Sequence, residues 1–225
     1  MPRDANTPTM TRTNLFLLPP KGSLTPNTPD DPLPYYYKPL VGWFFKKRIE
    51  QALALLNPPF KSVLEVGYGS GILLPSLAQM ADRVTGVDLA SDPEVVGTNL
   101  RRLGVQCHLI KGNLLEVTFD KEGFDLIVAI SVLEHIQDLE PVFERLHELL
   151  TPSGYLLVGM PRVDKFMEKA FASIGFKGIE QHHVTTYKMC IEAATPWFRL
   201  VKRAHLVPWL PEWAGLYFNM LFQKK

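Results

Sequence analysis

Short apolar runs alternate through the centre of the chain with longer segments in which apolar residues recur at every third or fourth position. The runs predict strands, and the longer segments predict amphipathic helices. The predicted strands are 62–66, 83–88, 105–110, 124–130 and 155–160. The helices expected between them are 72–81, 93–103 and 139–150. This alternation predicts an α/β fold with a doubly wound, Rossmann-like sheet of mostly parallel strands.

The pattern changes on both sides of this core. Apolar residues at helical spacing predict a helix at 46–56, before the first strand. After residue 161 the expected elements are helices at 163–173 and 187–194 and strands at 198–203 and 216–222. The last two strands are expected to pair antiparallel at the edge of the sheet.

Residues 1–34 contain eight prolines, interspersed with Thr, Asn and Asp. A segment of this composition buries too little apolar surface to offset its ordering entropy, so we expect a disordered tail. The sequence leaves open whether an apolar patch such as Asn14–Leu18 docks on the domain, and whether the tail becomes ordered over the site.

Charge and cysteine content exclude several classes of protein. The chain carries 24 basic and 23 acidic residues, so it lacks the basic surplus typical of a nucleic-acid-binding protein. The basic residues concentrate on two flanks of an acidic centre. This distribution favours an anionic small molecule or a lipid surface as partner, or simply solvated helix faces. Cys107 and Cys190 lack metal-ligand spacing, and no metal site is expected.

Targeting signals are also missing from the pattern. No apolar stretch reaches the roughly 20 residues that a membrane-spanning helix needs, and the N-terminus lacks the apolar core of a signal peptide. The longest apolar stretch, 207–222, is interrupted by Pro208, Pro211 and Glu212. We therefore expect a cytoplasmic protein.

The strongest chemical signal is a glycine loop after the first strand. Gly67, Gly69 and Gly71 lie between that strand and the next helix, where a backbone without Cβ atoms lets a ligand approach closely. Ile72 occupies the position that a dinucleotide-binding fingerprint would fill with its third glycine. A pyrophosphate site is therefore disfavoured.

Polar residues follow the other strands at the same end of the predicted sheet. Asp88 ends the second strand, where a carboxylate can accept two hydrogen bonds from a ribose diol. Asn113 follows the third strand, and Ser131 and His135 follow the fourth. Because open α/β sheets bind ligands at the carboxyl ends of their strands, these segments predict one shared site.

Together these motifs resemble the class I S-adenosylmethionine-dependent methyltransferases. Glu65-Val66-Gly67-x-Gly69-x-Gly71 looks like the first motif of that family. The segments similar to its later motifs, in order, are 87–89, 112–114, 124–127 and 131–136. The chain is most similar to the branch called type 11, which includes the quinone-ring methyltransferases. The resemblance covers 61–161, and it implies five parallel strands, an antiparallel strand pair and S-adenosylmethionine as the cofactor.

By position, the resemblance implies roles for the residues that follow the strands. The three loop glycines would pass under the methionine moiety, Glu65 would order the loop, and Asp88 would bind the ribose diol. Leu89 would pack on the adenine, Asn113 and Leu114 would flank its edge, and Ser131 would border the methyl donor. The family more often has Asp in place of Asn113, which puts adenine selectivity through this side chain in question.

Methyl transfer needs donor and acceptor close together in a dry site, and a base where the acceptor is a hydroxyl or an acidic carbon. The candidates for this catalytic role are Glu134, His135 and His183. Each also has a structural interpretation, as a capping or hydrogen-bonding group. The expected substrate contacts are Tyr36, Tyr37, His182, His183 and Tyr187. No Cys, Asp or Glu lies at ligand spacing from the histidine pair, which disfavours a metal there.

Aromatic residues accompany the basic flanks. One group comprises Tyr35–Tyr37 and 43–48, and in the resembling family such N-terminal segments often lie over the acceptor site. The other comprises Trp197, Trp209, Trp213, Tyr217 and Phe218, near Arg199, Lys202 and Arg203. Tryptophan beside basic residues is typical of peripheral membrane contact as well as of packed sheet edges. Core packing and contact with the inner face of a membrane both stay open.

The chain is thus expected to comprise a disordered tail (1–34), a cap helix (35–60), a cofactor-binding core (61–161) and a substrate-side extension (162–225). The expected function is methyl transfer from S-adenosylmethionine to a small acceptor, apolar or anionic, such as a quinol or lipid. Two alternatives are a cofactor-binding or membrane-recruited scaffold without turnover, and a protein or nucleic-acid methyltransferase. No Asn-Pro-Pro-Tyr signature follows the fourth strand, which argues against a DNA amino-group methylase. No nucleic-acid partner is expected, and the oligomeric state is not determined.

Overall fold

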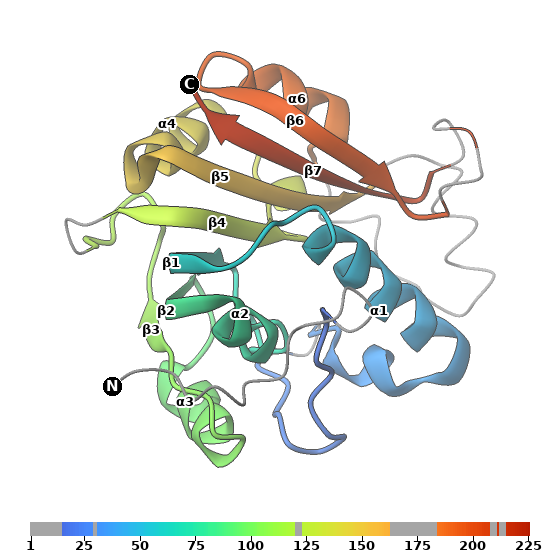
Figure 1. Cartoon of the computed structure of the whole chain (residues 1–225). Helices are drawn as coiled ribbons and strands as arrows, with labels where there is room; N and C mark the ends of the chain where they lie inside the picture. The colour runs from blue at the N-terminus through green and yellow to red at the C-terminus, as the bar shows by residue number, and fades with distance from the viewer. Residues whose placement is uncertain (1–14, 29–30, 120–122, 163–183, 208–210, 212–214) are drawn as a thin grey trace.

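The computed structural model of the chain describes residues 15–28, 31–119, 123–162, 184–207, 211 and 215–225. Within this part of the chain, seven strands form one sheet (Figure 1). They are β1 (Phe60–Val66), β2 (Ala81–Asp88), β3 (His108–Lys111), β4 (Phe124–Ile130), β5 (Leu150–Pro161), β6 (Phe198–His205) and β7 (Tyr217–Lys224). Their order is β3-β2-β1-β4-β5-β7-β6. The first five run parallel and β7 is antiparallel to both its neighbours, which confirms the predicted fold class.

Helices cover both faces of the sheet. The helices are α1 (Pro39–Leu53), α2 (Leu74–Met80), α3 (Pro93–Arg102), α4 (Glu140–Leu149) and α6 (Tyr187–Ala194), with short 3-10 turns η1 (Leu33–Tyr37) and η2 (Leu133–His135). On one face, α1, α2 and α3 pack through side chains such as Leu77 and Leu100. On the other, α4 and α6 pack through Phe143 and Cys190. The central strands are therefore buried on both sides, which explains the apolar run 126–130 of β4.

The first helix begins seven residues before the predicted start at 46. Proline is favoured in the first turn of a helix because its fixed φ suits the turn and its missing N–H needs no partner there. Pro39 occupies this position. The residues that follow it are apolar on several sides, with Leu40 and Trp43 exposed but Phe44 and Phe45 buried. Their mixed burial concealed the helical period in the sequence.

Residues 151–154, which precede the expected start of the fifth strand at 155, lie inside β5. The pairing passes from Phe124 opposite Leu150 to Leu126 opposite Tyr155, so the extra residues form an irregularity within the strand. Pro152 has no N–H to contribute to a regular ladder, and such residues are tolerated at bulges. β3 is also shorter than expected, since it begins at His108 rather than at 105.

The C-terminal strand pair is confirmed, with β7 between β5 and β6. Tyr217 and Phe218 are buried within the sheet layers, and Trp197 is partly buried with its ring 5.5 Å from that of His147. For these three aromatic residues the structure supports core packing rather than membrane contact. Trp209 and Trp213 lie outside the described residues.

Residues 15–28 and 31–34 do not form the disordered tail predicted from the composition of the N-terminal segment. Phe16, Leu24 and Leu33 are buried against the domain. The N–H of Leu17 donates to Ser76 on α2 at 2.9 Å. Widely spaced apolar side chains thus anchor a proline-rich, extended chain, a feature that average composition does not reveal. Residues 1–14 and 29–30, and the helix expected at 163–173, lie outside the described part.

Candidate cofactor and acceptor site

The loop that follows β1 adopts a backbone that favours glycine. The φ angles of Gly67, Gly69 and Gly71 are +75°, +52° and +82°, all in the left-handed region. A Cβ at Gly67 would collide with the side chain of Val132, and one at Gly71 would press on Val96. A Cβ at Gly69 would meet no described atom within 4 Å. The first and third glycines are therefore needed for packing, whereas the second leaves open space for a ligand.

Asp88 joins this loop to the turn after β2. One carboxylate oxygen accepts the N–H of Gly69 at 2.8 Å. The other accepts the N–H groups of Ala90 and Ser91 at 2.9 and 2.8 Å. The side chain thereby fixes the two segments between which the resemblance places a ribose. Contact of Asp88 with the ribose itself stays a prediction.

Glu65 is a buried carboxyl on β1, directly before the loop. It is 5% exposed, and its Oε2 has no hydrogen-bond partner among the described residues. Burial, together with the negative charge of Asp88, raises the pKa of Glu65 well above its ordinary value. A cationic amino group would donate a hydrogen bond to Oε2 of Glu65 and would offset the negative charge of its ionised carboxylate. The residues present therefore fit the methionine moiety of S-adenosylmethionine.

The residues expected around the adenine are arranged unequally. Leu89 is 72% exposed beside Asp88, and a planar ring could cover this apolar side chain. Asn113 accepts the N–H of Leu115 at 3.1 Å, so its side chain closes the turn after β3. Leu114 is largely buried in the core. The structure suits Leu89 for ring contact, and the roles of Asn113 and Leu114 stay predictions.

A buried polar cluster lies at the carboxyl end of β4. Arg48 on α1 donates to Ser131 Oγ at 2.9 Å and to the hydroxyl of Tyr36 at 3.1 Å. Ser131 Oγ also lies 2.8 Å from the hydroxyl of Tyr217 on β7. The guanidinium of Arg48 lies 4.5 Å from the ring centre of Phe45. Its Nε has no hydrogen-bond partner within the described chain, so it is suited to an anionic ligand group.

Ser131 occupies a strained backbone position in this cluster. Its φ is +57°, in the left-handed region that residues other than glycine rarely adopt. The backbone N–H of Ser131 donates to Gly159 at 2.7 Å, and its hydroxyl is held by Arg48 and Tyr217. Strain maintained by such contacts is common at functional sites.

Glu134 is the buried acid next to this cluster. It is 1% exposed, and its Oε2 lacks a hydrogen-bond partner in the described part of the molecule. Burial raises the pKa of Glu134 to about 8, although the charge of Arg48 and a hydrogen bond from Ser131 oppose the shift. Its protonation therefore changes near neutral pH. The neighbouring His135 is exposed on η2.

Not all of the predicted substrate contacts belong to the polar cluster around Arg48 and Ser131. Tyr36 belongs to the cluster, but the hydroxyl of Tyr37 donates to Pro19 at 2.9 Å and anchors the N-terminal segment. Tyr187 stacks on Phe218 with their ring centres 3.8 Å apart. His182 and His183 lie outside the described residues, so their catalytic and substrate roles stay predictions.

Sequence reasoning missed Arg48 as a site residue and treated it only as part of a basic flank. The available signal was its position on α1. It lies four residues after Phe44 and four before Ala52, both buried on the inner stripe of the helix. A basic residue on an apolar stripe must find buried partners, and this one finds them at the ends of β4 and η1.

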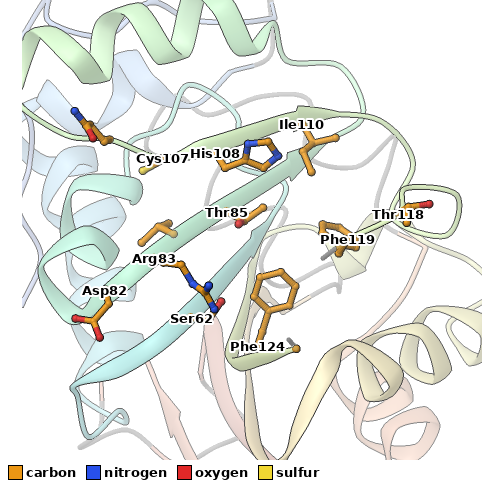
Figure 2. Close-up of a pocket in the computed structure, with 13 residues that line it drawn as sticks. Ser62, Asp82, Arg83, Thr85, Cys107, His108, Ile110, Thr118, Phe119 and Phe124 are labelled. Carbon is orange, nitrogen blue, oxygen red and sulfur yellow. The ribbon is translucent and has the colours of Figure 1, made fainter. Parts of the chain in front are cut away.

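A cavity of about 710 Å³ lies elsewhere, toward the amino ends of the central strands (Figure 2). Arg83 on β2, His108 on β3 and Phe124 at the start of β4 line it. Asp88 and Ser131 follow the opposite ends of β2 and β4. The cavity is therefore separate from the site predicted by the motifs.

The described geometry defines a class of protein. A doubly wound sheet carries a left-handed glycine loop after β1, an acidic residue at the end of β2 and polar side chains after β4. This arrangement is that of a protein that binds a nucleoside-containing cofactor across its strand ends. The described residues include no group of three His, Cys, Asp or Glu side chains that could hold a metal ion.

A family profile described as a methyltransferase domain matches residues 43–189, more than half of the chain. The chain therefore belongs to the methyltransferase-domain family, and the class I S-adenosylmethionine-dependent group inferred from its motifs is confirmed. S-adenosylmethionine is the methyl donor of this group.

Curated relatives include proteins named ubiquinone biosynthesis O-methyltransferase. The one from Shewanella pealeana is 32% identical over 99 residues, which are 43% of this chain and 42% of that protein. The one from Haemophilus ducreyi is 27% identical over 177 residues, 73% of this chain and 72% of the relative. The chain thus spans less than half of the first relative and nearly three quarters of the second.

Solved structures show the same fold at low identity. An N-methyltransferase from Bradyrhizobium japonicum, solved with S-adenosylhomocysteine, has a TM-score of 0.61 and 20% identity, covering 87% of this chain and 92% of that one. The 1,6-didemethyltoxoflavin-N1-methyltransferase of Burkholderia thailandensis has a TM-score of 0.61 and 23% identity, covering 82% and 81%.

The raised pKa of Glu134 predicts a pH-dependent stability. Its folded-state pKa of about 8 exceeds the ordinary value of 4.5, so the folded state holds the proton more tightly. The protonated Glu134 therefore contributes its full stabilisation below the ordinary pKa of 4.5, and this stabilisation is lost as the pH rises through the folded-state pKa of about 8. In the Glu134→Gln variant, the free energy of unfolding should therefore fall less steeply with pH than in the wild type, between about pH 5 and about pH 9.

Burial also raises the pKa of Glu65, so the free energy of unfolding of the Glu134→Gln variant should still fall in part as the pH rises. Glu144→Gln, which removes an exposed carboxyl from α4, controls for the loss of one charge. Equal slopes for the wild type and Glu134→Gln would contradict the raised pKa.

Proposed function

We propose that the protein transfers the methyl group of S-adenosylmethionine to a hydroxyl of a small aromatic acceptor, apolar or anionic. The observation that carries this proposal is the open loop at Gly69 together with the unpartnered buried carboxyl of Glu65. The relatives named ubiquinone biosynthesis O-methyltransferase favour a quinol-like hydroxyl as the acceptor.

Residues of three elements would hold the donor. Asp88 accepts hydrogen bonds from the ribose diol, and Leu89 packs on the adenine. Glu65 faces the amino group of the methionine moiety, and the unpartnered Nε of Arg48 is available to its carboxylate. When bound, the donor would supply a methyl group on a positively charged sulfonium, and the sulfur would leave with the electron pair of the broken S–CH3 bond as a neutral thioether.

The chain's own part in the reaction is orientation and proton transfer. Glu134 is the base in this proposal, because its Oε2 lacks a described partner and its pKa of about 8 lies near neutrality. In its ionised form it takes the proton of the acceptor hydroxyl and makes that oxygen more nucleophilic. Exposed His135 is less suited to this role, since an acceptor must be shielded from water.

The outer face of α1 suits contact with an anionic membrane surface, where an apolar acceptor would reside. Leu40 is 84% exposed and Trp43 is 50% exposed, and Lys47 follows at helical spacing. Lys38 lies just before the helix, with its ammonium 4.2 Å from the ring centre of Tyr35. Exposed apolar and basic side chains on one face favour peripheral binding. Among the described residues, no helix has the length and apolar character needed to cross a bilayer.

Calorimetric titration tests donor binding. Wild-type protein should bind S-adenosylmethionine and S-adenosylhomocysteine and should not bind NAD. Asp88→Ala should weaken the binding of both methionine-derived compounds by about 10- to 150-fold, since charge-assisted hydrogen bonds contribute about 1.5 to 3 kcal/mol. Asp92→Asn is the matched control, because Asp92 caps α3 and Asn also caps helices well. Failure of the folded wild type to bind either compound would refute the proposal.

Kinetics with a catechol-type acceptor test the base. Glu134→Gln should lower kcat by about 10²- to 10⁴-fold, because the amide cannot accept the acceptor's proton, and should leave the KM for the donor nearly unchanged. The wild-type kcat should rise with pH up to about 8, following the pKa of Glu134. His135→Gln serves as the control. A wild-type pH profile retained by Glu134→Gln would exclude this residue as the base.

Vesicle flotation tests the membrane surface. The protein should float with phosphatidylglycerol-containing vesicles at about 50 mM salt and much less at about 500 mM, because salt screens exposed charges. Replacing Leu40 and Trp43 by Ser should abolish flotation, whereas Val95→Ser, at an exposed position on α3, should not. No flotation of the wild type at low salt would contradict membrane contact through α1.

A further inference from the structure

The N-terminal segment reaches the predicted donor site through a short strap, defined here as residues 24–28 and Asp31. The strap has anchors of its own. Leu24 is buried against the domain, and Thr25 accepts a hydrogen bond from Asn99 on α3 at 3.1 Å. These contacts hold the strap on the surface of α3 independently of the glycine loop.

Asn27 connects the strap to both segments that border the donor site. Its side-chain Nδ2 donates to the backbone carbonyl of Gly69 and, at 3.0 Å, to the hydroxyl of Ser91. Asp88 already accepts the N–H groups of Gly69 and Ser91. Both the N–H and the carbonyl of Gly69 are therefore held, one by a residue of the core and the other by the strap.

Asp31 fixes the position of Asn27. One of its carboxylate oxygens accepts the N–H of Asn27 at 3.0 Å, and the other accepts the N–H of Leu33 at 2.8 Å. The side chain of Asp31 is buried and also lies 3.4 Å from the hydroxyl of Ser70. The amide of Asn27 is thus held in place before it meets the loop.

We propose that Asn27 is a positioning residue of the donor site. By joining the loop after β1 to the turn after β2, it holds Gly69 and Ser91 in the arrangement that receives the cofactor. Gly69 has no side chain and adopts a left-handed φ, so it loses more conformational freedom on ordering than another residue would. An anchored loop has lost that freedom already, and binding becomes tighter. The identity of the ligand rests on the proposed function.

Hydrogen exchange of the backbone amides of Gly69 and Gly71 tests the positioning directly, without added ligand. Asn27→Ala and Asn27→Asp both remove the Nδ2 donor, and the second keeps the shape of the side chain. Exchange should accelerate by about fivefold or more in both variants, since each lost hydrogen bond contributes about 1 kcal/mol. Thr25→Ala loosens the strap at α3 only, and should leave the exchange of these two amides unchanged.

Donor binding tests the consequence for function. In the Asn27 variants, S-adenosylmethionine and S-adenosylhomocysteine should bind about 5- to 30-fold more weakly, as expected for two lost hydrogen bonds. The KM for the donor should rise while kcat at saturating donor stays the same, a division that general destabilisation would not give. Thr25→Ala should bind as the wild type does.

Unchanged exchange at Gly69 and Gly71 in the Asn27 variants would overturn the inference, and so would equal effects of Asn27→Ala and Thr25→Ala. Faster exchange with unchanged donor affinity would also overturn it. If the wild type binds neither compound, the proposed function fails, and the exchange experiment still decides whether Asn27 positions the loop.

Discussion

The buried positive charge of Arg48 is the constraint on which the arrangement of the site depends. Burying a charge is costly unless hydrogen bonds and nearby partners compensate it. The partners of Arg48 come from η1, through Tyr36, and from the end of β4, through Ser131. The backbone carbonyl of Arg48 accepts the side-chain amide of Asn219 on β7 at 3.0 Å. The N-terminal cap, the core and the C-terminal extension therefore meet at one residue, which fixes α1 across the carboxyl ends of the strands.

Two buried carboxyl groups lack complete hydrogen bonding among the described residues. Glu65 and Glu134 each keep one unpartnered oxygen, and burial raises the pKa of both. An unsatisfied buried polar group costs about 1 to 3 kcal/mol, and a ligand that supplied the missing partner would offset that cost. Departures of this kind gather at functional sites. Here one lies before the loop assigned to the donor, and the other lies beside Ser131, which follows β4.

The sequence predicted features that depend on neighbouring residues and missed those that depend on distant ones. The run 124–130 matches β4 at both ends, because a strand buried on two faces favours apolar residues, as at 126–130. The start of α1 was missed because mixed burial conceals its helical period. The docking of Phe16, which the sequence leaves open, depends on contacts with residues far away in the chain. The same holds for Asn27 and Arg48. Their partners lie 42 and 83 residues away at Gly69 and Ser131. The periodic pattern of the local sequence does not indicate contacts between residues so far apart.

The proposed role of Glu134 as a base would distinguish an enzyme from a scaffold that only retains the fold. A glutamine would fill the same space, and it would avoid the cost of ionising a buried carboxyl. What glutamine cannot do is change protonation near neutral pH, as a carboxyl with a pKa of about 8 does. A scaffold has no use for that property, whereas a reaction that removes a proton from a hydroxyl requires it. Under the proposed function, the buried acid of Glu134 would therefore serve turnover and not cofactor binding alone.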